Sequence, residues 1–268
     1  MKKILMLTAI ISIIVIGFYF YFHNIGRVRA NVNEIFIPSA DVPAPFEGTR
    51  IVQISDLFVR SEHCLVLLEN VVYSVNELKP EIIVFTGNLF RSEGISFANQ
   101  VADLLSNLDA EIIQIAVFGY HDLPHYEVTS SVLSEAGFRL LNNESIQVFN
   151  QSPIGINVIG AYPINDRDTM DQLLEEHAME NRFNILLMSI PTYSTTSFEH
   201  PVHAQFSGHC LATQNASDPA DPCFQFYNGT YQFADRFTLH VSSGLARFHT
   251  IQGIFRPPSI DSFLLMQE

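Results

Sequence analysis

Basic residues are scarce in this chain. Lysine and arginine total 14 against 28 aspartates and glutamates, which gives a formal net charge of −14, and no run of basic residues interrupts the pattern. Nucleic acid and anionic membrane surfaces are both negatively charged and would be repelled by such a chain. We therefore expect no nucleic-acid partner.

Cysteine is equally scarce, with Cys64, Cys210 and Cys223 as its three positions. Three cysteines are too few for a disulfide scaffold, and their spacing matches no zinc ribbon or finger. The simplest interpretation is one pair and one buried thiol. A bridge between Cys210 and Cys223 could form in an exported domain and would add about 3 kcal/mol in the loop-closure model, whereas in the cytosol the pair would stay reduced.

Charge is absent altogether from residues 4–22, which read ILMLTAIISIIVIGFYFYF. As a helix this segment would rise about 28 Å, close to the roughly 30 Å hydrocarbon core of a bilayer. A cleaved signal peptide is the alternative, but aromatic residues stand where small ones should precede cleavage. We expect a retained membrane anchor over residues 1–26. Lys2 and Lys3 favour an extracytoplasmic domain, a bias that Arg27 and Arg29 weaken.

The remaining sequence contains no repeat and no second linker, and 47 % of the whole chain is apolar, enough for a real core. We expect a proline-containing tether over residues 27–47 and one domain over residues 48–268. Apolar runs predict strands at 50–54, 81–86, 111–118, 146–149, 154–159, 183–189, 203–207, 237–242 and 260–266. Apolar stripes predict helices around 65–75, 101–108, 129–137 and 168–180. This alternation indicates an α/β layered protein.

Polar residues gather where four of the predicted strands end. The segments are Ser55-Asp56, Gly87-Asn88, Gly119-Tyr120-His121-Asp122 and Gly208-His209-Cys210. Each has an ordinary explanation by itself, such as a turn residue or a hydrogen-bonded core histidine. Four in series at strand ends predict a common crevice.

The order of these segments resembles the calcineurin-like metallophosphoesterases, particularly the membrane-anchored bacterial branch. The family pattern D-x-H, G-D, G-N-H-D/E, a lone His and G-H-x-H corresponds here to QISDLF, KPEIIVFTGNLF, VFGYHD, ILLMSIP and FSGHCL. The similarity extends over residues 48 to 266. It implies a four-layer α/β/β/α metallophosphoesterase sandwich, preceded in this chain by one N-terminal transmembrane helix.

The resemblance also implies seven ligand positions for two divalent metals, and this chain departs from most of them. Asp56 and His209 match the family. The five that differ are Phe58, Asn88, Tyr120, Ser189 and Leu211. Because a dinuclear centre needs anionic and imidazole ligands to offset four positive charges, we expect no stable metal pair.

The substituted positions fall into two groups. Phe58 and Leu211 replace histidines of the same metal, so we expect them to pack together and fill the vacated space. Asn88, Tyr120 and Ser189 can hydrogen-bond with one another and with the retained ligands. His121 and Asp122 match the family's general acid and the residue that orients it. Without an activated nucleophile, a structural role for this pair is favoured.

Two functions remain open. The first is a single-pass, membrane-anchored pseudophosphoesterase without a cofactor that binds a phosphorylated ligand or a protein partner. The second is a weak metal-dependent phosphohydrolase with one Mn, Fe or Zn ion on Asp56, Asn88 and His209, and with His121 as acid. A different zinc site that involves His200 and His203 is a further alternative.

Overall fold

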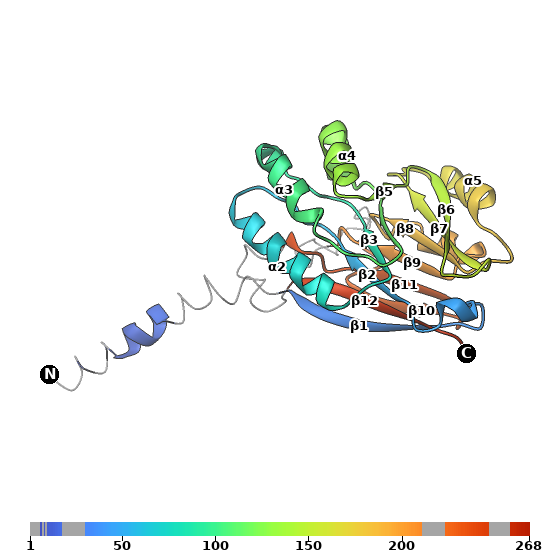
Figure 1. Cartoon of the computed structure of the whole chain (residues 1–268), viewed down its shortest axis with the longest axis horizontal. Coiled ribbons are helices and arrows are strands. Elements are labelled where there is room, and N and C mark those ends of the chain that lie inside the picture. The colour runs from blue at the N-terminus through green and yellow to red at the C-terminus, as the bar shows by residue number, and fades with distance from the viewer. Residues whose placement is uncertain (1–5, 7, 9, 18–29, 211–222, 247–257) are drawn as a thin grey trace.

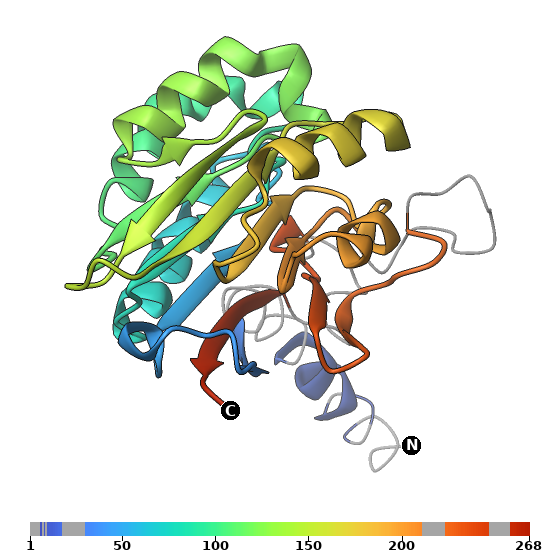
Figure 2. The same cartoon turned by 90° about the vertical axis from the view of Figure 1, so that its right-hand side faces the viewer.

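The computed structural model describes residues 6, 8, 10–17, 30–210, 223–246 and 258–268. Two six-stranded sheets pack face to face, and helices cover the outer face of each sheet (Figures 1 and 2). Three apolar clusters fill the spaces between these four layers. The expected α/β/β/α sandwich is therefore confirmed.

The first sheet mixes parallel and antiparallel strands. Its order is β1 (Asn31–Pro38), β12 (Ser259–Met266), β2 (Arg50–Ile54), β3 (Ile82–Phe85), β4 (Ile113–Ala116) and β5 (Arg139–Leu140). Strand β12 runs antiparallel to β2, and β2, β3, β4 and β5 are parallel. Strand β3 is continuously apolar and buried along its length, and β2 is buried from Ile51 to Ile54, as expected of strands covered on both faces.

The second sheet is built from the rest of the chain. Its order is β10 (Gly229–Phe233), β11 (Phe237–Val241), β9 (Ala204–Ser207), β8 (Asn184–Met188), β7 (Gly155–Ala161) and β6 (Glu144–Phe149). The two inner faces interdigitate through large side chains. Phe206 of β9 and Phe263 of β12, for example, stack with ring centroids 4.0 Å apart. This contact locks one sheet onto the other.

Amphipathic helices close the outer faces. Helices α2 (His63–Glu77), α3 (Ala98–Leu105) and α4 (Tyr126–Glu135) cover the first sheet, and α5 (Arg167–His177) and α6 (Ser194–Glu199) cover the second. Short 3-10 turns occur at η1 (Ala44–Phe46), η2 (Ser92–Phe97) and η3 (Tyr120–His125). The predicted stripe on α2 is confirmed, because Leu68, Val72 and Val75 are buried.

The structure corrects the expected tether at residues 27–47. Residues 31–38 form β1, which pairs in parallel with β12 from Asn31–Ser259 to Pro38–Met266. Its sequence, NVNEIFIP, shows neither a regular alternation nor a continuous apolar run, and Val32 and Phe36 are exposed on the edge of the sheet. The partner strand is more than 200 residues away in the sequence. The folded domain therefore begins at β1 rather than at residue 48.

The expected membrane anchor, residues 1–26, lies largely outside the described residues. Of this segment, residues 10–17 are helical, and their apolar side chains, such as Ile13 and Val15, are exposed. No helix in the described part of the chain combines the length and the apolar character that a bilayer crossing requires.

Candidate functional site

Asp56 lies at the carboxyl end of β2 and is fully buried. One carboxylate oxygen accepts hydrogen bonds from the Ser55 hydroxyl and the His209 backbone N–H, both at 2.8 Å. The other accepts from the Asn88 side-chain amide at 2.7 Å. Burial raises the pKa of Asp56 to about 6, and these hydrogen bonds partly offset the shift. Both oxygens are therefore engaged by the protein itself.

Asn88, at the end of β3, is the centre of the polar network. Its amide nitrogen contacts Asp56 and lies 3.4 Å from both the Ser189 hydroxyl and Nδ1 of His209. Its amide oxygen accepts the backbone N–H of His121 at 3.1 Å. Loops that follow four other strands, β2, β4, β8 and β9, thus reach one neutral side chain, so the polar segments predicted at strand ends lie together.

Asp122 joins two of these loops through their backbones. One oxygen accepts from the N–H groups of Asn88 at 2.6 Å and Gly119 at 2.8 Å, and the other from Leu89 at 2.8 Å. The carboxylate is fully buried, and burial raises its pKa to about 6 despite the three backbone donors. Asp122 therefore fixes the loops after β3 and β4 as a structural residue.

The backbone around these residues adopts unusual conformations. Asp56, Phe58, Asn88 and His209 all have positive φ angles, of 54°, 45°, 64° and 64°. For residues other than glycine such conformations are uncommon and persist only where the surrounding structure enforces them. Strained non-glycine residues therefore follow β2, β3 and β9, and the surrounding structure holds them in place at this end of the sandwich.

Gly87 shows how closely the loops approach each other. Its φ is +92°, and a Cβ atom added there would lie 2.8 Å from the backbone Cα of Gly119. A side chain at this position would push apart the loops that carry Asn88 and Asp122. The glycine is therefore required by backbone contact between the two loops.

Phe58 is covered by a cation and an imidazole. The guanidinium carbon of Arg91 lies 4.1 Å from the centroid of the Phe58 ring, and the His121 ring meets it edge-on at 5.0 Å. Nη1 of Arg91 is 3.3 Å from Nδ1 of His121. Burial, followed by the charge of Arg91, lowers the pKa of His121 to about 4. Leu211, the expected packing partner of Phe58, lies outside the described residues.

The structure corrects the role expected for Tyr120. Its hydroxyl lies 2.5 Å from Oδ1 of Asn165 and 3.1 Å from the carbonyl oxygen of Ile164, in the loop before α5. It takes no part in the hydrogen bonds around Asn88, because the 3-10 turn η3 directs the ring toward the second sheet. Ser189, in contrast, is buried beside Asn88 as expected.

Sequence reasoning missed Arg91. It follows Asn88 by three positions and belongs to none of the family motifs, so no spacing signal indicated its position above Phe58. The available signal was chemical, because Arg91 is a cation close in sequence to the predicted polar segment Gly87-Asn88, in a chain with few cations.

The donor set does not fit a dinuclear metal centre. Of the seven family ligand positions, Asp56 supplies a carboxylate and His209 an imidazole. Both oxygens of Asp56 already accept hydrogen bonds from the protein. Among the described residues, no group of three or more His, Cys, Asp or Glu side chains could hold a metal ion. Two divalent cations require more anionic ligands than these residues supply.

The alternative zinc site around His200 and His203 is wrong for the described part of the chain. Nε2 of His200 lies 3.0 Å from Asp171, and Nε2 of His203 lies 3.2 Å from Asp41. Each histidine is thus held by a separate carboxylate, away from His121.

The cysteines follow the simplest interpretation. Cys210, directly after His209, forms a disulfide with Cys223, and Cys64 is a buried thiol. The bridge anchors the chain immediately beyond the strained His209 backbone.

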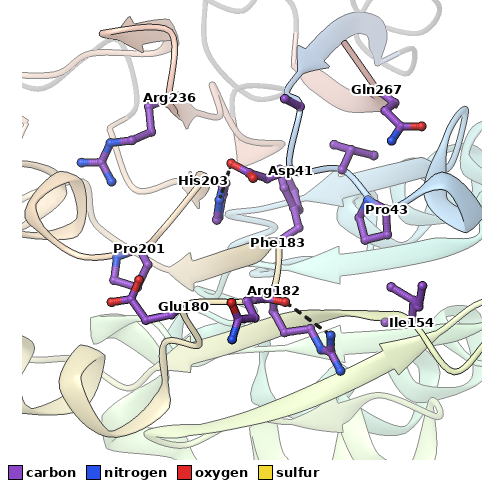
Figure 3. A pocket seen from close by; sticks show the side chains of 14 residues that line it. Asp41, Pro43, Ile154, Glu180, Arg182, Phe183, Pro201, His203, Arg236 and Gln267 are labelled. Carbon is purple, nitrogen blue, oxygen red and sulfur yellow. Dashed lines mark hydrogen bonds and ion pairs between the residues drawn. The ribbon is translucent and has the colours of Figure 1, made fainter.

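A cavity of about 540 Å³ lies at the opposite end of the sandwich (Figure 3). It is found where β7, β8 and β9 begin, and its walls include Asp41, Arg182 and His203. In Figure 3 the Asp41 carboxylate points at the His203 ring, and a dashed line marks their ion pair. This cavity is therefore separate from the network around Asn88.

Comparisons with known proteins show what this chain is similar to. The chain is 29 % identical to the uncharacterized metallophosphoesterase YkuE of Bacillus subtilis over 72 % of its own length and 68 % of the relative. It is 32 % identical to the UDP-2,3-diacylglucosamine pyrophosphatase LpxG of Chlamydia muridarum and 28 % identical to a transmembrane protein with metallophosphoesterase domain of Danio rerio. These two matches span about a quarter of each relative, 25 % and 27 %. No family model matches.

Among solved structures, the fold matches a dimetal phosphatase from Danio rerio with a TM-score of 0.53 at 10 % identity. The match covers 83 % of this chain and 94 % of the other. Together with the sequence relatives, this match shows that the chain is similar to proteins named metallophosphoesterases and has a calcineurin-like fold.

Proposed function

We propose that the chain is a degenerate metallophosphoesterase that acts as a binding module. The observation that carries this proposal is the donor set around Asn88. A neutral amide takes the place from which the family's bridging carboxylate would serve both metals, and it ties up Asp56 with a 2.7 Å hydrogen bond. Without a metal-activated hydroxide, His121 has no nucleophile to assist.

Metal analysis combined with enzyme assays tests the proposal. The full chain, purified in detergent, is incubated with Mn²⁺, Fe²⁺ or Zn²⁺, desalted, and analysed for bound metal. Phosphomonoester and phosphodiester hydrolysis is then measured with each metal. We expect metal far below one equivalent per chain and no turnover above that of an Asp56→Ala variant.

The alternative is a weak phosphohydrolase with one metal on Asp56, Asn88 and His209. The convergence of these side chains within hydrogen-bonding distance favours it over other enzyme classes. Bound metal near one equivalent, together with turnover that His121→Ala abolishes, would establish this alternative and rule out the degenerate module.

We further propose that the module is tethered to a membrane by its N-terminal segment, with the domain on the extracytoplasmic side. Residues 4–22 carry no charge, and Lys2 and Lys3 precede them. The Cys210–Cys223 disulfide supports an oxidising compartment. Carbonate extraction of membranes should leave the chain in the pellet, and protease added to intact spheroplasts should digest the domain. Protection from protease would place the domain in the cytoplasm.

The partner of such a module would be a phosphorylated ligand or another protein. The net charge of −14 argues against nucleic acid. A phosphorylated ligand is favoured because the module keeps the architecture of a phosphoesterase site.

A further inference from the structure

Three nitrogen-bearing side chains gather over the outer side of the polar network. Arg91 stacks on Phe58 at 4.1 Å and lies 3.3 Å from the His121 ring, and the rings of His121 and His209 stack with centroids 5.8 Å apart. All three side chains are only partly buried. They come from the loops after β3, β4 and β9, so the fold brings together groups that are 30 to 118 positions apart.

Two carboxylates lie beside this cluster, and the protein itself engages both. Asp56 and Asp122 are fully buried, and their oxygens accept from Ser55, Asn88 and backbone N–H groups. Among the described residues, the partly exposed side chains at this place include a guanidinium and two imidazoles, in a chain with a net charge of −14. Guanidinium presents several N–H groups in a fixed fork, a geometry that suits phosphate oxygens.

Phe58 gives Arg91 a defined position. A cation over an aromatic face is attracted to the ring, and a planar guanidinium also stacks on it. The Phe58 side chain is 5 % exposed and its backbone φ is 45°, so the platform itself is held firmly. An arginine held in this way loses less conformational freedom when it binds an anion than a freely moving one.

The sheet register places this site next to the chain's entry into the domain. Asn33 of β1 pairs with Asp261, and Asp261 pairs with Gln53 of β2, three residues before Asp56. Two strand spacings, about 10 Å, thus separate Asn33 from Gln53. Because β1 is parallel to β12 and β12 is antiparallel to β2, β1 starts at the end of the sandwich where β2 finishes. A membrane-bound N-terminal segment would hold this end near the bilayer.

We propose that Arg91, His121 and His209 bind a phosphate-type oxyanion without a metal ion, a proposal that rests on the degenerate function above. The Arg91 guanidinium takes the place of metal charge, and the histidines donate ring N–H groups. The ligand chemistry is shared by free phosphate and by phosphorylated lipid headgroups. The position of β1 favours the headgroup, because a tethered site would face the membrane surface.

Calorimetric titration of the full chain in detergent with EDTA tests the proposal. One arm uses inorganic phosphate, and the other uses dihexanoyl phosphatidic acid at a concentration below its micelle formation. Arg91→Gln should weaken both interactions about 10- to 100-fold, since it removes a charge-assisted hydrogen bond. Arg91→Lys should fall between wild type and Arg91→Gln, because lysine keeps the charge without the fork.

Arg182→Gln is the matched control. Arg182 is also partly buried but lines the cavity at the opposite end of the sandwich, so its removal should leave both interactions unchanged. Thermal unfolding of each variant shows whether the fold is retained. The headgroup is the ligand if phosphatidic acid binds at least about tenfold more tightly than phosphate, and a free oxyanion is the ligand if the two bind equally.

The outcomes separate this inference from the proposed function. Absence of binding in both arms, in a protein that also lacks metal, would overturn the oxyanion site and leave the degenerate module intact. Equal binding by wild type and Arg91→Gln would likewise overturn it. Binding that EDTA abolishes and Mn²⁺ restores would overturn both.

Discussion

The two ends of the sandwich are closed by different kinds of interaction. At the end where β2, β3 and β9 finish, buried Asp56 and Asp122 accept hydrogen bonds from the chain around them. At the end where β8 and β9 begin, the ion pair between His203 and the largely exposed Asp41 borders an open cavity (Figure 3). One end depends on buried charge, and the other on surface charge.

The two ends also differ in where their left-handed backbone conformations occur. Asp56, Asn88 and His209 are left-handed inside the site, where each such residue costs on the order of 1–3 kcal/mol. Near the cavity, the left-handed Ala234 and Asp235 lie in the hairpin turn between β10 and β11, where this conformation is common. The comparison teaches that the site end keeps a costly, highly connected geometry even though most of its ligand positions differ from the family pattern.

Removal of the Asp122 carboxylate should have the largest effect. Asp122→Ala leaves the N–H groups of Asn88, Leu89 and Gly119 without their acceptor in a buried place. We expect a loss of about 3–5 kcal/mol in the free energy of unfolding, measured by urea denaturation. The matched control is Asp166→Ala, which removes the exposed cap of α5 and should cost much less. Equal losses would mean that the site end is no more dependent on its carboxylate than a helix cap is.

Loss of the disulfide should have the next largest effect. The bridge between Cys210 and Cys223 closes a loop directly after His209, and its removal enlarges the conformational freedom of the unfolded chain. The double Cys210→Ala, Cys223→Ala variant should lose about 2–4 kcal/mol in urea denaturation. A reducing agent should destabilise the wild-type protein by a similar amount and leave the double variant unchanged. A wild-type protein that is insensitive to reduction would contradict the prediction.

The pH dependence of stability should distinguish the buried carboxylates. Burial raises the folded-state pKa of Asp56 from 3.8 to about 6, so its favourable contribution is present at low pH and is lost as the pH rises through 6. The loss is on the order of 1–3 kcal/mol for a fully buried group. Asp122 titrates in the same direction. His121, with its pKa lowered to about 4, opposes them, because its contribution is lost as the pH falls from 6.5 toward 4.

Asp56→Asn removes one of the two contributions to the free energy of unfolding that decrease as the pH rises, the other being that of Asp122. Between pH 4 and about 6.5, its free energy of unfolding should therefore decrease less steeply with pH than that of the wild-type protein. His121→Gln removes the opposing contribution and should make the decrease steeper. Urea denaturation at half-unit pH steps provides both slopes. Identical slopes for wild type and Asp56→Asn would show that Asp56 has the same pKa in the folded and unfolded chain.

The layered fold was predictable from local signals. Short, mainly apolar segments such as residues 50–54 and 183–189 are typical of strands buried on both faces, and both predictions match β2 and β8 within a residue or two. Strand β1 was not predictable in this way. Its pairing with β12 depends on chain topology, and its exposed Val32 and Phe36 obscure the burial pattern.

The site was predictable in its location but only partly in its contacts. Family spacing correctly brought Asp56, Asn88 and His209 together. It could not show that the Tyr120 hydroxyl reaches Asn165 or that Arg91 lies over Phe58. Side-chain direction depends on the turn that carries each residue, and η3 has no equivalent in the spacing of a motif.

The smallest effect should come from the cavity end. Asp41→Asn removes the charge that faces His203, but the Asp41 side chain is 66 % exposed, and surface ion pairs contribute about 0–1 kcal/mol. Nδ1 of His203 still accepts the Asn184 N–H at 3.0 Å, so the ring remains anchored without Asp41. Urea denaturation at pH 7 should show a loss of free energy of unfolding within that range, far below the loss expected for Asp122→Ala. A loss as large as that of Asp122→Ala, about 3 kcal/mol or more, would mean that charge closes both ends of the sandwich equally strongly, and the contrast between buried and surface charge would no longer hold.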